Sequence, residues 1–243
     1  RAVDRHRPHG HAGHGRRAKW HYSSAPERFS SDYPWRAQYY IDPDVARERQ
    51  VQKYGEQVWR VGICDVTAPT NRRTVIAAML PMQCAAGNTL NTAVIASDQD
   101  NAAITLYFLA ILNSLVFDYI VRFSVKLHLN QFILLANPVP RLTPGDAYFD
   151  AIVPRAARLT CTTADFADLW THVMDEPWDP AKGARETAER QRLRDELDVL
   201  VARLYGVNRE AFANILETFP LVFPDDEQGK AKKTALLDLM SEL

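Results

Sequence analysis

The feature that most constrains this chain is a long apolar stretch at positions 101–121. It reads N-A-A-I-T-L-Y-F-L-A-I-L-N-S-L-V-F-D-Y-I-V, and its apolar residues cover nearly the full circumference of a helix. Residues 97–100 (S-D-Q-D) precede it with the residue types of a helix N-cap. We therefore expect one helix that begins near residue 101, reaches about Phe123 and is buried on most sides.

The same stretch is long enough to cross a membrane on length alone. However, it carries Asn113, Ser114 and Asp118, and strand-like segments with polar residues flank it. Buried polar groups need hydrogen-bond partners, so we interpret these three side chains as caps for a neighbouring loop rather than as catalytic groups. We expect the core helix of a soluble protein, with no membrane contact.

Short runs rich in β-branched and aromatic residues surround the apolar stretch and predict strands. The predicted strands are residues 33–41, 57–66, 73–80, 90–96 and 130–135. A helix is expected at residues 42–54, because Pro43 suits a first helical position and Gly55 suits an end. The pattern favours an α+β fold, with a mixed β-sheet around the buried helix.

The character of the chain changes near residues 141–145, after which only helical patterns follow. The expected helices are residues 146–159, 163–173, 186–205, 208–218 and 230–243. Gly206 is a candidate C-cap of the third of these helices. The chain therefore divides into a leader (residues 1–32), a mixed segment (33–143) and an all-helical C-terminal segment (144–243).

The leader is basic and rich in histidine, with His6, His9, His11, His14 and His21. Imidazole is a common metal ligand, so a metal site is one interpretation. No Cys or carboxylate stands within the cluster at a fixed structural spacing, and the composition favours a flexible, solvated leader. The chain starts with Arg1 and lacks the apolar segment of a signal peptide, so we expect a piece of a longer polypeptide.

Charge and cysteine content narrow the function classes. The formal net charge is -1, so any affinity for nucleic acid must come from a local surface or from a larger parent protein. Cys64, Cys84 and Cys161 are widely spaced and form no C-x-x-C pair. A disulfide framework is not expected, and a reducing, cytoplasmic location is the natural interpretation.

Several motifs around the apolar stretch occur together and in order. They are C-D-V at 64–66, T-N-R-R-T at 70–74, I-A-A at 76–78 with Pro81, L-N-S-L-V-F-D-Y at 112–119, H-L-N-Q-F at 128–132 and P-V-P at 138–140. Residues 194–198, 204–210 and 215–220 continue the pattern in the helical segment. This series resembles the C-terminal target-recognition region of adenine-specific DNA methyltransferases of type IIG restriction–modification and phage-defence systems.

The resemblance covers most of residues 33–243, and it implies that residues 33–143 form a bacterial DNA target-recognition domain. It also implies double-stranded DNA as a partner, and a methyltransferase domain or subunit, in cis or in trans, that binds S-adenosylmethionine. Two positions depart from the family pattern: Cys64 stands where Arg is common, and Arg72 where Glu is common. Either change would alter local pairing without changing the fold.

Catalytic motifs of the parent enzymes are missing from this sequence. There is no N-P-P-Y-type motif for gripping the target adenine, since no two prolines are adjacent. We also find no glycine-rich strand–turn–helix for S-adenosylmethionine and no P-D…(D/E)-x-K nuclease pattern. We therefore expect this chain to bind DNA without modifying it, with no catalytic residue, no metal site and no cofactor of its own.

Two loops beside the predicted strands hold the candidate DNA contacts. Arg and Lys suit phosphates and guanine edges, while Asn and Gln suit adenine edges. The candidates are Asn71, Arg72, Arg73, Arg122, Lys126, His128, Asn130 and Gln131.

Each loop also has a structural interpretation. Arg72 and Arg73 are alternatively solvated edge charges that discourage strand addition, and Asn130 alternatively satisfies buried backbone groups near a turn. Asp65 is expected to pair with Arg72 or Arg73 and to fix that loop. A second function also stays open: a protein–protein docking module, whose helical segment recruits a methylase or nuclease partner.

Overall fold

The computed structural model describes residues 3–5, 20–22, 42–54, 58–82, 84–95 and 101–243. Two short strands, β1 (Val3–Arg5) and β2 (Trp20–Tyr22), pair antiparallel within the predicted leader. The other residues of the leader, and the strand predicted for residues 33–41, lie outside the described residues. The helix predicted for residues 42–54 is confirmed as α2 (Pro43–Tyr54).

The main sheet has three strands in the order β4-β3-β5. β3 (Arg60–Cys64) lies in the centre, and both β4 (Ala77–Leu80) and β5 (Leu90–Ala93) pair with it antiparallel. These strands confirm three of the predicted runs. The prediction of a mixed sheet is wrong for the described strands, because both edge strands run antiparallel to β3.

The apolar stretch forms two helices instead of the single predicted one. α3 (Asn101–Leu112) and α4 (Leu115–Arg122) meet at a bend of 62°. Ser114 has an extended backbone (φ -77°, ψ 154°), and its hydroxyl accepts the N–H of Phe117, so it is the N-cap of α4. The serine within the apolar stretch therefore starts a new helix, which the apolar periodicity alone did not reveal.

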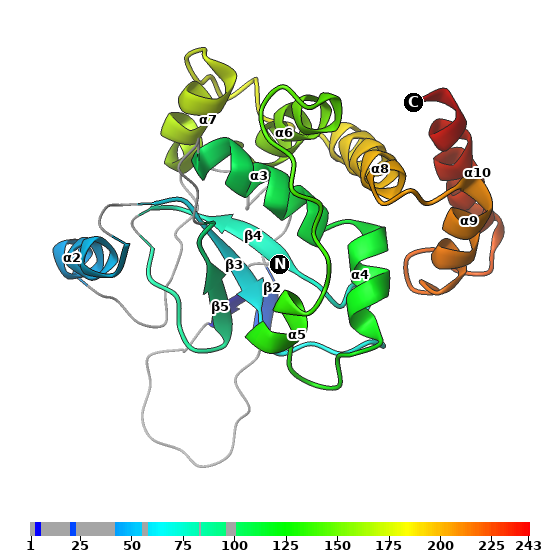
Figure 1. The fold of residues 1–243 in the computed structure, drawn as a ribbon, viewed down its shortest axis with the longest axis horizontal. Coiled ribbons are helices and arrows are strands. Elements are labelled where there is room, and N and C mark those ends of the chain that lie inside the picture. Colours follow the sequence, from blue (N-terminus) through cyan, green and yellow to red (C-terminus); the bar gives the residue numbers. More distant parts are fainter. Residues whose placement is uncertain (1–2, 6–19, 23–41, 55–57, 83, 96–100) are drawn as a thin grey trace.

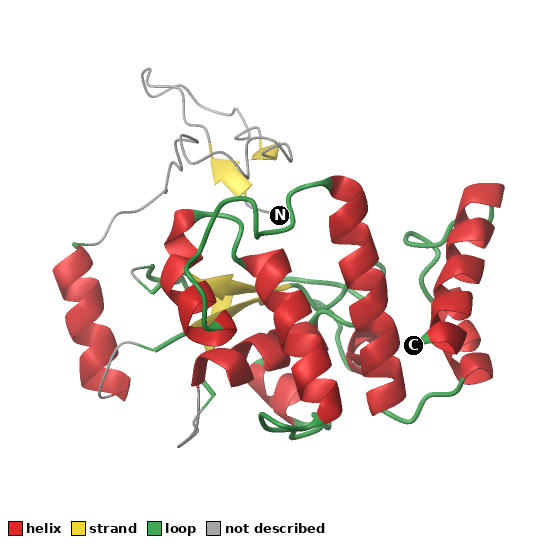
Figure 2. Cartoon of the chain, turned by 90° about the horizontal axis from the view of Figure 1, so that it is seen from above, coloured by secondary structure: helices red, strands yellow, loops and turns green. Residues whose placement is uncertain are grey.

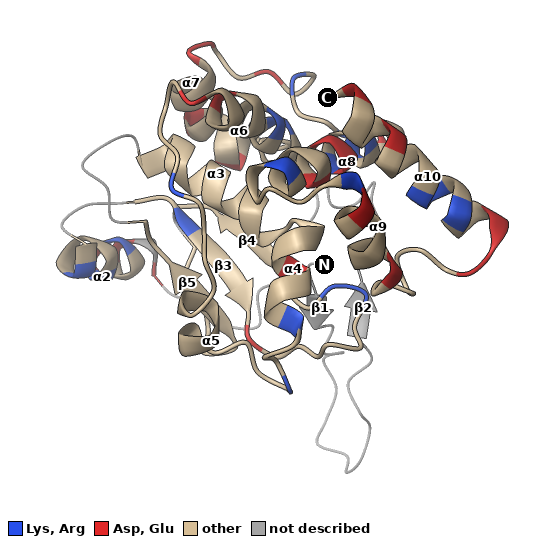
Figure 3. Cartoon of the chain, turned by 45° about the vertical axis from the view of Figure 1, so that its right-hand side comes forward, with Lys and Arg blue, Asp and Glu red and all other residues tan. Residues whose placement is uncertain are grey.

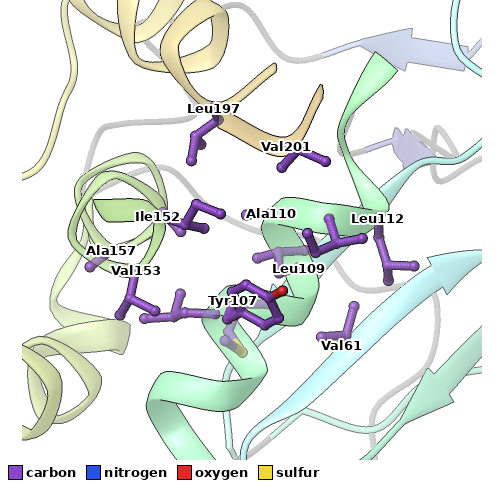
Figure 4. Close-up of a cluster of buried hydrophobic side chains, with 14 of the residues drawn as sticks. Val61, Tyr107, Leu109, Ala110, Leu112, Ile152, Val153, Ala157, Leu197 and Val201 are labelled. Atoms are coloured by element: carbon purple, nitrogen blue, oxygen red, sulfur yellow. The ribbon is translucent and has the colours of Figure 1, made fainter. Parts of the chain in front are cut away.

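A first hydrophobic core surrounds α3, which lies between the sheet and two helices of the C-terminal segment (Figure 1). Those helices are α6 (Ala147–Thr160) and α8 (Thr187–Leu204). Val61 of β3, Tyr107 and Leu112 of α3 and Ile152 of α6 are all buried in this core (Figure 4). The core continues across the boundary near residue 143, so the sheet and the first C-terminal helices bury one another's apolar surfaces.

A second core lies between α4, α8 and the last two helices, α9 (Arg209–Glu217) and α10 (Glu227–Glu242). Phe212, Leu216 and Phe219 are fully or almost fully buried there. α8 contributes to both cores, and Figure 2 shows α9 and α10 at the opposite end of the molecule from α2. The prediction that residues 144–243 are all-helical is confirmed; the helix expected at 163–173 is a short 3-10 turn, Ala164–Phe166, followed by α7 (Ala167–Met174).

The strand predicted for residues 130–135 is wrong, because this run forms the short helix α5 (Gln131–Leu135). Asn130 is its N-cap by backbone conformation. A short apolar run does not distinguish a strand from a helix by periodicity. Here the run has no strand partner along its length, and only an isolated bridge between Val66 and His128 precedes it.

Within the described part of the chain, no single helix is long and apolar enough to cross a membrane. Only α3 and α4 taken together reach that length and composition, and they are sharply bent. Most residues of both helices are buried against other elements of the fold.

Candidate functional site

Asp118 of α4 is fully buried and joins the loop before β4 to α4. One carboxylate oxygen accepts the backbone N–H groups of Thr74 (2.8 Å) and Val75 (3.1 Å) and the Nε–H of Arg73 (2.9 Å). The other accepts two hydrogen bonds from Arg122, at 3.1 and 2.8 Å. With five hydrogen bonds, this buried charge is compensated on both oxygens.

Arg73 also closes the end of α3. Its Nη2 donates to the backbone oxygens of Asn113 (2.6 Å) and Ser114 (2.7 Å), at the break between the two helices. A cation at a helix C-terminus satisfies the last carbonyls and the helix dipole. Arg73 therefore fixes the loop at residues 70–74 onto the bend of the apolar stretch.

Arg122 is buried as well, with only 7% of the residue exposed. Its Nη1 donates to the carbonyl oxygen of Thr218 at 2.7 Å, and its guanidinium lies 3.8 Å from the centre of the Phe219 ring. These contacts join α4 to the end of α9. Because the guanidinium groups of Arg122 and Arg73 are committed inside the fold, we leave both out of the DNA-contacting set proposed below.

Of the three polar residues in the apolar stretch, Asp118 caps a neighbouring loop as expected, whereas Asn113 pairs with a strand and Ser114 caps the helix that it begins. The side-chain amide of Asn113 pairs with the edge of β4, accepting from the N–H of Ala77 (3.2 Å) and donating to its carbonyl oxygen (3.1 Å). Ser114 caps α4, and Asp118 binds the loop before β4. The sequence motifs L-N-S-L-V-F-D-Y and T-N-R-R-T therefore meet in space as a structural joint.

Asp65 does not bind either arginine, so the predicted pairing with Arg72 or Arg73 is wrong. Its carboxylate contacts Nδ1 of His128 at 2.8 Å and the side-chain amide of Asn91 at 3.4 Å. Asp65 lies at the end of the central strand, whose neighbour is the strand of Asn91 and not the arginine loop. The histidine that we predicted as a DNA contact is thus held by a carboxylate.

The stretch that follows α4 is fastened to the sheet by its backbone. The N–H of Thr67 donates to the carbonyl of Leu127 (3.0 Å), and the N–H of Leu129 donates to the carbonyl of Asp65 (2.8 Å). We call residues 123–137 the α4–α5 segment. These bonds, together with the Asp65–His128 contact, hold an exposed segment against a rigid element of the fold.

Three candidates on the α4–α5 segment have polar groups that are free to bind a partner. Lys126, Asn130 and Gln131 are exposed, and their side chains make no hydrogen bond or ion pair with another described residue. The interpretation of Asn130 as a partner for buried backbone groups is therefore wrong. Asn71 is also exposed, but its side-chain amide donates to the hydroxyl of Thr67 at 3.3 Å.

Large apolar side chains accompany these polar groups, and sequence reasoning missed their exposure. Phe123 (72% exposed), Leu127 (57%), Phe132 (70%) and Leu135 (73%) all belong to the α4–α5 segment. An open hollow of about 600 Å³ runs along it, with Ser124, Lys126, His128, Asn130, Phe132 and Asn137 in its lining. One sequence signal for this exposure was available. Phe132 and Leu135 are spaced as on one face of a helix, and a helix of only five residues is too short to bury both side chains.

Arg72 faces a different part of the molecule. It is exposed, makes no hydrogen bond or ion pair with a described residue, and lines a second pocket together with Lys232 of α10. The two predicted loops therefore present their free side chains to two separate hollows. No sequence pattern distinguishes Arg72 from its neighbour Arg73.

No group of three His, Cys, Asp or Glu side chains in the described ranges is placed to hold a metal ion. Cys161 is fully buried, and burial raises the pKa of its thiol to about 12, so this cysteine is a packing residue and not a nucleophile. Comparison with protein-family models, with curated proteins and with solved structures found no match.

Proposed function

We propose that this chain is the duplex-DNA recognition part of an adenine-specific DNA methyltransferase of the restriction–modification or phage-defence type. The observation that carries the proposal is the α4–α5 segment, where Lys126, Asn130 and Gln131 present unpaired polar groups from a backbone fastened to the sheet. Specific contacts need side chains held on a rigid support, because ordering a mobile loop weakens binding.

The residue types on this segment suit DNA. An ammonium group binds a phosphate as a point charge, and a carboxamide makes a bidentate pair with the edge of adenine. The segment contains one lysine and no Asp or Glu, whereas the whole chain has a net charge of -1. A locally uncharged or positive surface is the part of this chain that a polyanion approaches at the lowest electrostatic cost.

The sequence resemblance to target-recognition regions supports the same assignment. In this proposal the present chain reads DNA, while a separate methyltransferase domain or subunit binds S-adenosylmethionine and flips the adenine out of the duplex. The division of labour leaves Arg73, Asp118 and Arg122 as the joint that positions the reading segment.

The test begins with selection of bound duplexes from a random DNA library, followed by fluorescence anisotropy titrations on the enriched sequence. Lys126→Ala is expected to weaken binding to every duplex and to lower the slope of log K against log salt by about 1, for one lost phosphate contact. Gln131→Ala is expected to cost about 1–3 kcal/mol on the selected sequence and little on a scrambled one.

Lys230→Ala is the matched control, because Lys230 is an exposed lysine on α10 that pairs with Asp225, far along the chain from the α4–α5 segment. Its affinity for the selected duplex should equal that of the wild type. An unchanged affinity in the double variant Lys126→Ala/Gln131→Ala would exclude this segment as the DNA contact. Failure to enrich any duplex would count against DNA recognition by the chain alone.

A second function is favoured by the apolar side chains of the same segment. Phe123, Leu127, Phe132 and Leu135 are all largely exposed on one segment of fifteen residues, and Leu127 and Phe132 line the same hollow. Exposed apolar patches mark protein interaction sites. The surface then docks a methylase or nuclease partner, as the alternative interpretation of the sequence expected, although that interpretation placed the docking on the helical segment.

The two functions are separated by a polar substitution in the apolar part. Phe132→Ser leaves Lys126 and Gln131 in place, so a DNA-reading surface retains its affinity within a few-fold, as the anisotropy assay would show. A docking surface loses its complex with the co-expressed methyltransferase in a pull-down, while Lys126→Ala retains it. Loss of DNA affinity in both variants, with the complex intact, contradicts the docking function.

A further inference from the structure

A second pocket lies where the sheet meets the C-terminal helices, and none of its lining residues belongs to the α4–α5 segment. Its volume is about 570 Å³, and β4, α3, α6, α8 and α10 all contribute to its wall. Its apolar lining residues include Leu109, Val222 and Phe223, and we call these three the floor. This size matches sites that hold small molecules.

The wall of this pocket is positively charged. Five of its lining residues are Arg or Lys and two are Asp, which is a formal excess of three positive charges in a chain whose net charge is -1. The basic residues are Arg72, Arg73, Arg190, Arg194 and Lys232. Figure 3 marks the Lys and Arg positions of α8 and α10 in blue along the ribbon.

Two of these cations form no close ion pair. Arg72 makes none with a described residue, and the ammonium nitrogen of Lys232 lies 5.2 Å from the centre of the Phe223 ring, with Asp195 and Asp198 acting on it only through the electrostatic field. The charge of Arg73 is already matched by Asp118. The pocket therefore presents two cations that no close ion pair holds in place, from segments that are far apart in the sequence.

The hydrogen bonds of the two aspartates in the wall go to groups other than Arg72 and Lys232. Asp198 is buried and accepts the backbone N–H of Leu115 at 2.7 Å, while Asp195 accepts the side-chain amide of Gln191 at 2.8 Å. Neither carboxylate forms a described ion pair with Arg72 or Lys232. They limit the positive potential without closing the pocket to an anion.

The cations also repel one another. Burial lowers the pKa of Lys232, and the charges of Arg72 and Arg194 act in the same direction, whereas Asp195 and Asp198 oppose it. Like charges held close together beside a half-buried hollow are stabilised when an anion lies between them. An apolar floor beneath such a pair favours an anion that carries an apolar body.

We propose that this pocket binds a phosphate group, held between Arg72 and Lys232, with the apolar part of the ligand on the floor at Val222 and Phe223. A doubly charged phosphate monoester matches the excess charge better than a carboxylate does, and guanidinium and ammonium groups are the usual phosphate ligands. The phosphate belongs either to a small phosphomonoester or to a DNA backbone.

The test uses phenyl phosphate as the probe, with inorganic phosphate and benzoate for comparison, in isothermal titration calorimetry at low, constant ionic strength. Phenyl phosphate should bind most tightly, since it supplies both the dianion and the ring. Arg72→Gln and Lys232→Gln should each weaken its binding about tenfold or more, as expected for the loss of one charge-assisted contact.

Lys230→Gln is the control on the same helix, because Lys230 is exposed, pairs with Asp225 and is outside the pocket. It should bind phenyl phosphate as the wild type does. Circular dichroism of each variant checks that the fold is retained. The inference is overturned if phenyl phosphate does not bind at millimolar concentration, or if Arg72→Gln and Lys232→Gln bind it as tightly as the wild type.

Competition identifies the source of the phosphate. If the pocket holds a backbone phosphate, a short duplex displaces phenyl phosphate, and Arg72→Gln weakens both ligands. If it holds a small molecule, the duplex does not compete. Because the α4–α5 segment is tested through Lys126 and Gln131, failure of the proposed DNA function leaves the phenyl phosphate result unaffected.

Discussion

Replacement of Asp118 by asparagine is the most informative single change in this fold. The side chain keeps its shape and one acceptor oxygen, but it loses its charge and replaces the second acceptor with a donor. Arg73 and Arg122 then face an amide in place of a carboxylate, and Arg122 is almost fully buried. Both oxygens of Asp118 accept N–H groups, so the new NH₂ group faces hydrogen-bond donors whichever oxygen it replaces.

The magnitude follows from the geometry. Removing one partner from a buried ion pair destabilises a protein by about 3–5 kcal/mol, because the remaining charge stays desolvated. The five hydrogen bonds at Asp118 are not independent, so their separate contributions are not added. For a chain of this size the expected loss in melting temperature is about 6–20 °C.

The free energy of unfolding is measured by urea titration with far-UV circular dichroism, for Asp118→Asn beside the control Asp238→Asn. Asp238 pairs with Arg209 on the surface, and both side chains are more than half exposed. Exposed pairs contribute about 0–1 kcal/mol, so the control should unfold nearly as the wild type does. A double-mutant cycle with Arg122→Met gives the coupling energy of the buried pair.

A loss below about 1 kcal/mol for Asp118→Asn would refute this reasoning, since that is the range of an exposed pair. It would mean that water or a rearranged loop replaces the carboxylate at low cost. A large loss in stability with no coupling to Arg122 would instead assign the effect to the backbone N–H groups of Thr74 and Val75.

Two further outcomes are expected. Gly229→Ala should destabilise the protein by about 1–3 kcal/mol in urea titrations, because a Cβ atom there would lie 1.9 Å from the carbonyl oxygen of Pro224. Gly87→Ala is the control and should have little effect, since a Cβ atom at Gly87 would have no neighbour within 4 Å. Burial raises the pKa of the Asp198 carboxyl group to about 6. Between about pH 4 and 6 the folded state therefore keeps a proton that the unfolded state releases. The contribution of Asp198 to the free energy of unfolding falls as pH rises through that window. Asp198→Asn retains an acceptor for the N–H of Leu115. Between pH 4 and pH 7 it should therefore gain up to about 3 kcal/mol of stability relative to the wild type. A stability difference that does not change with pH would contradict the raised pKa of Asp198.

Local sequence patterns were sufficient to predict most elements of the fold. The strands at 60–64, 77–80 and 90–93 and the helices of the C-terminal segment occur where their residue patterns indicated. Such patterns report the period of apolar residues along one element, which is a local property. They failed at α5, where a run of six residues fits either period, and at Ser114, where one hydroxyl ends a continuous apolar run by capping a new helix.

The candidate site was less predictable, because it depends on which residues meet. Asp65 was expected to bind an arginine and binds His128, which comes from a segment more than sixty residues later. The same limitation applies to Phe132, whose apolar character suggested burial and whose ring is 70% exposed. Burial is decided by what packs on an element, and nothing within a five-residue helix determines that.

The apolar pattern was enough to predict that 101–121 is buried in an α+β fold, and it correctly indicated that Asp118 caps a neighbouring loop. The roles of Arg72 and Arg73, which are adjacent, chemically identical and expected to act together, depend on the tertiary structure. Arg73 neutralises Asp118 inside the fold, while Arg72 lies at the wall of a pocket with Lys232. Asp118 and Lys232 are each more than forty residues away from these arginines in the chain. The folded arrangement of α4, α8 and α10 therefore makes Arg73 structural and leaves Arg72 without an ion-pair partner among the described residues.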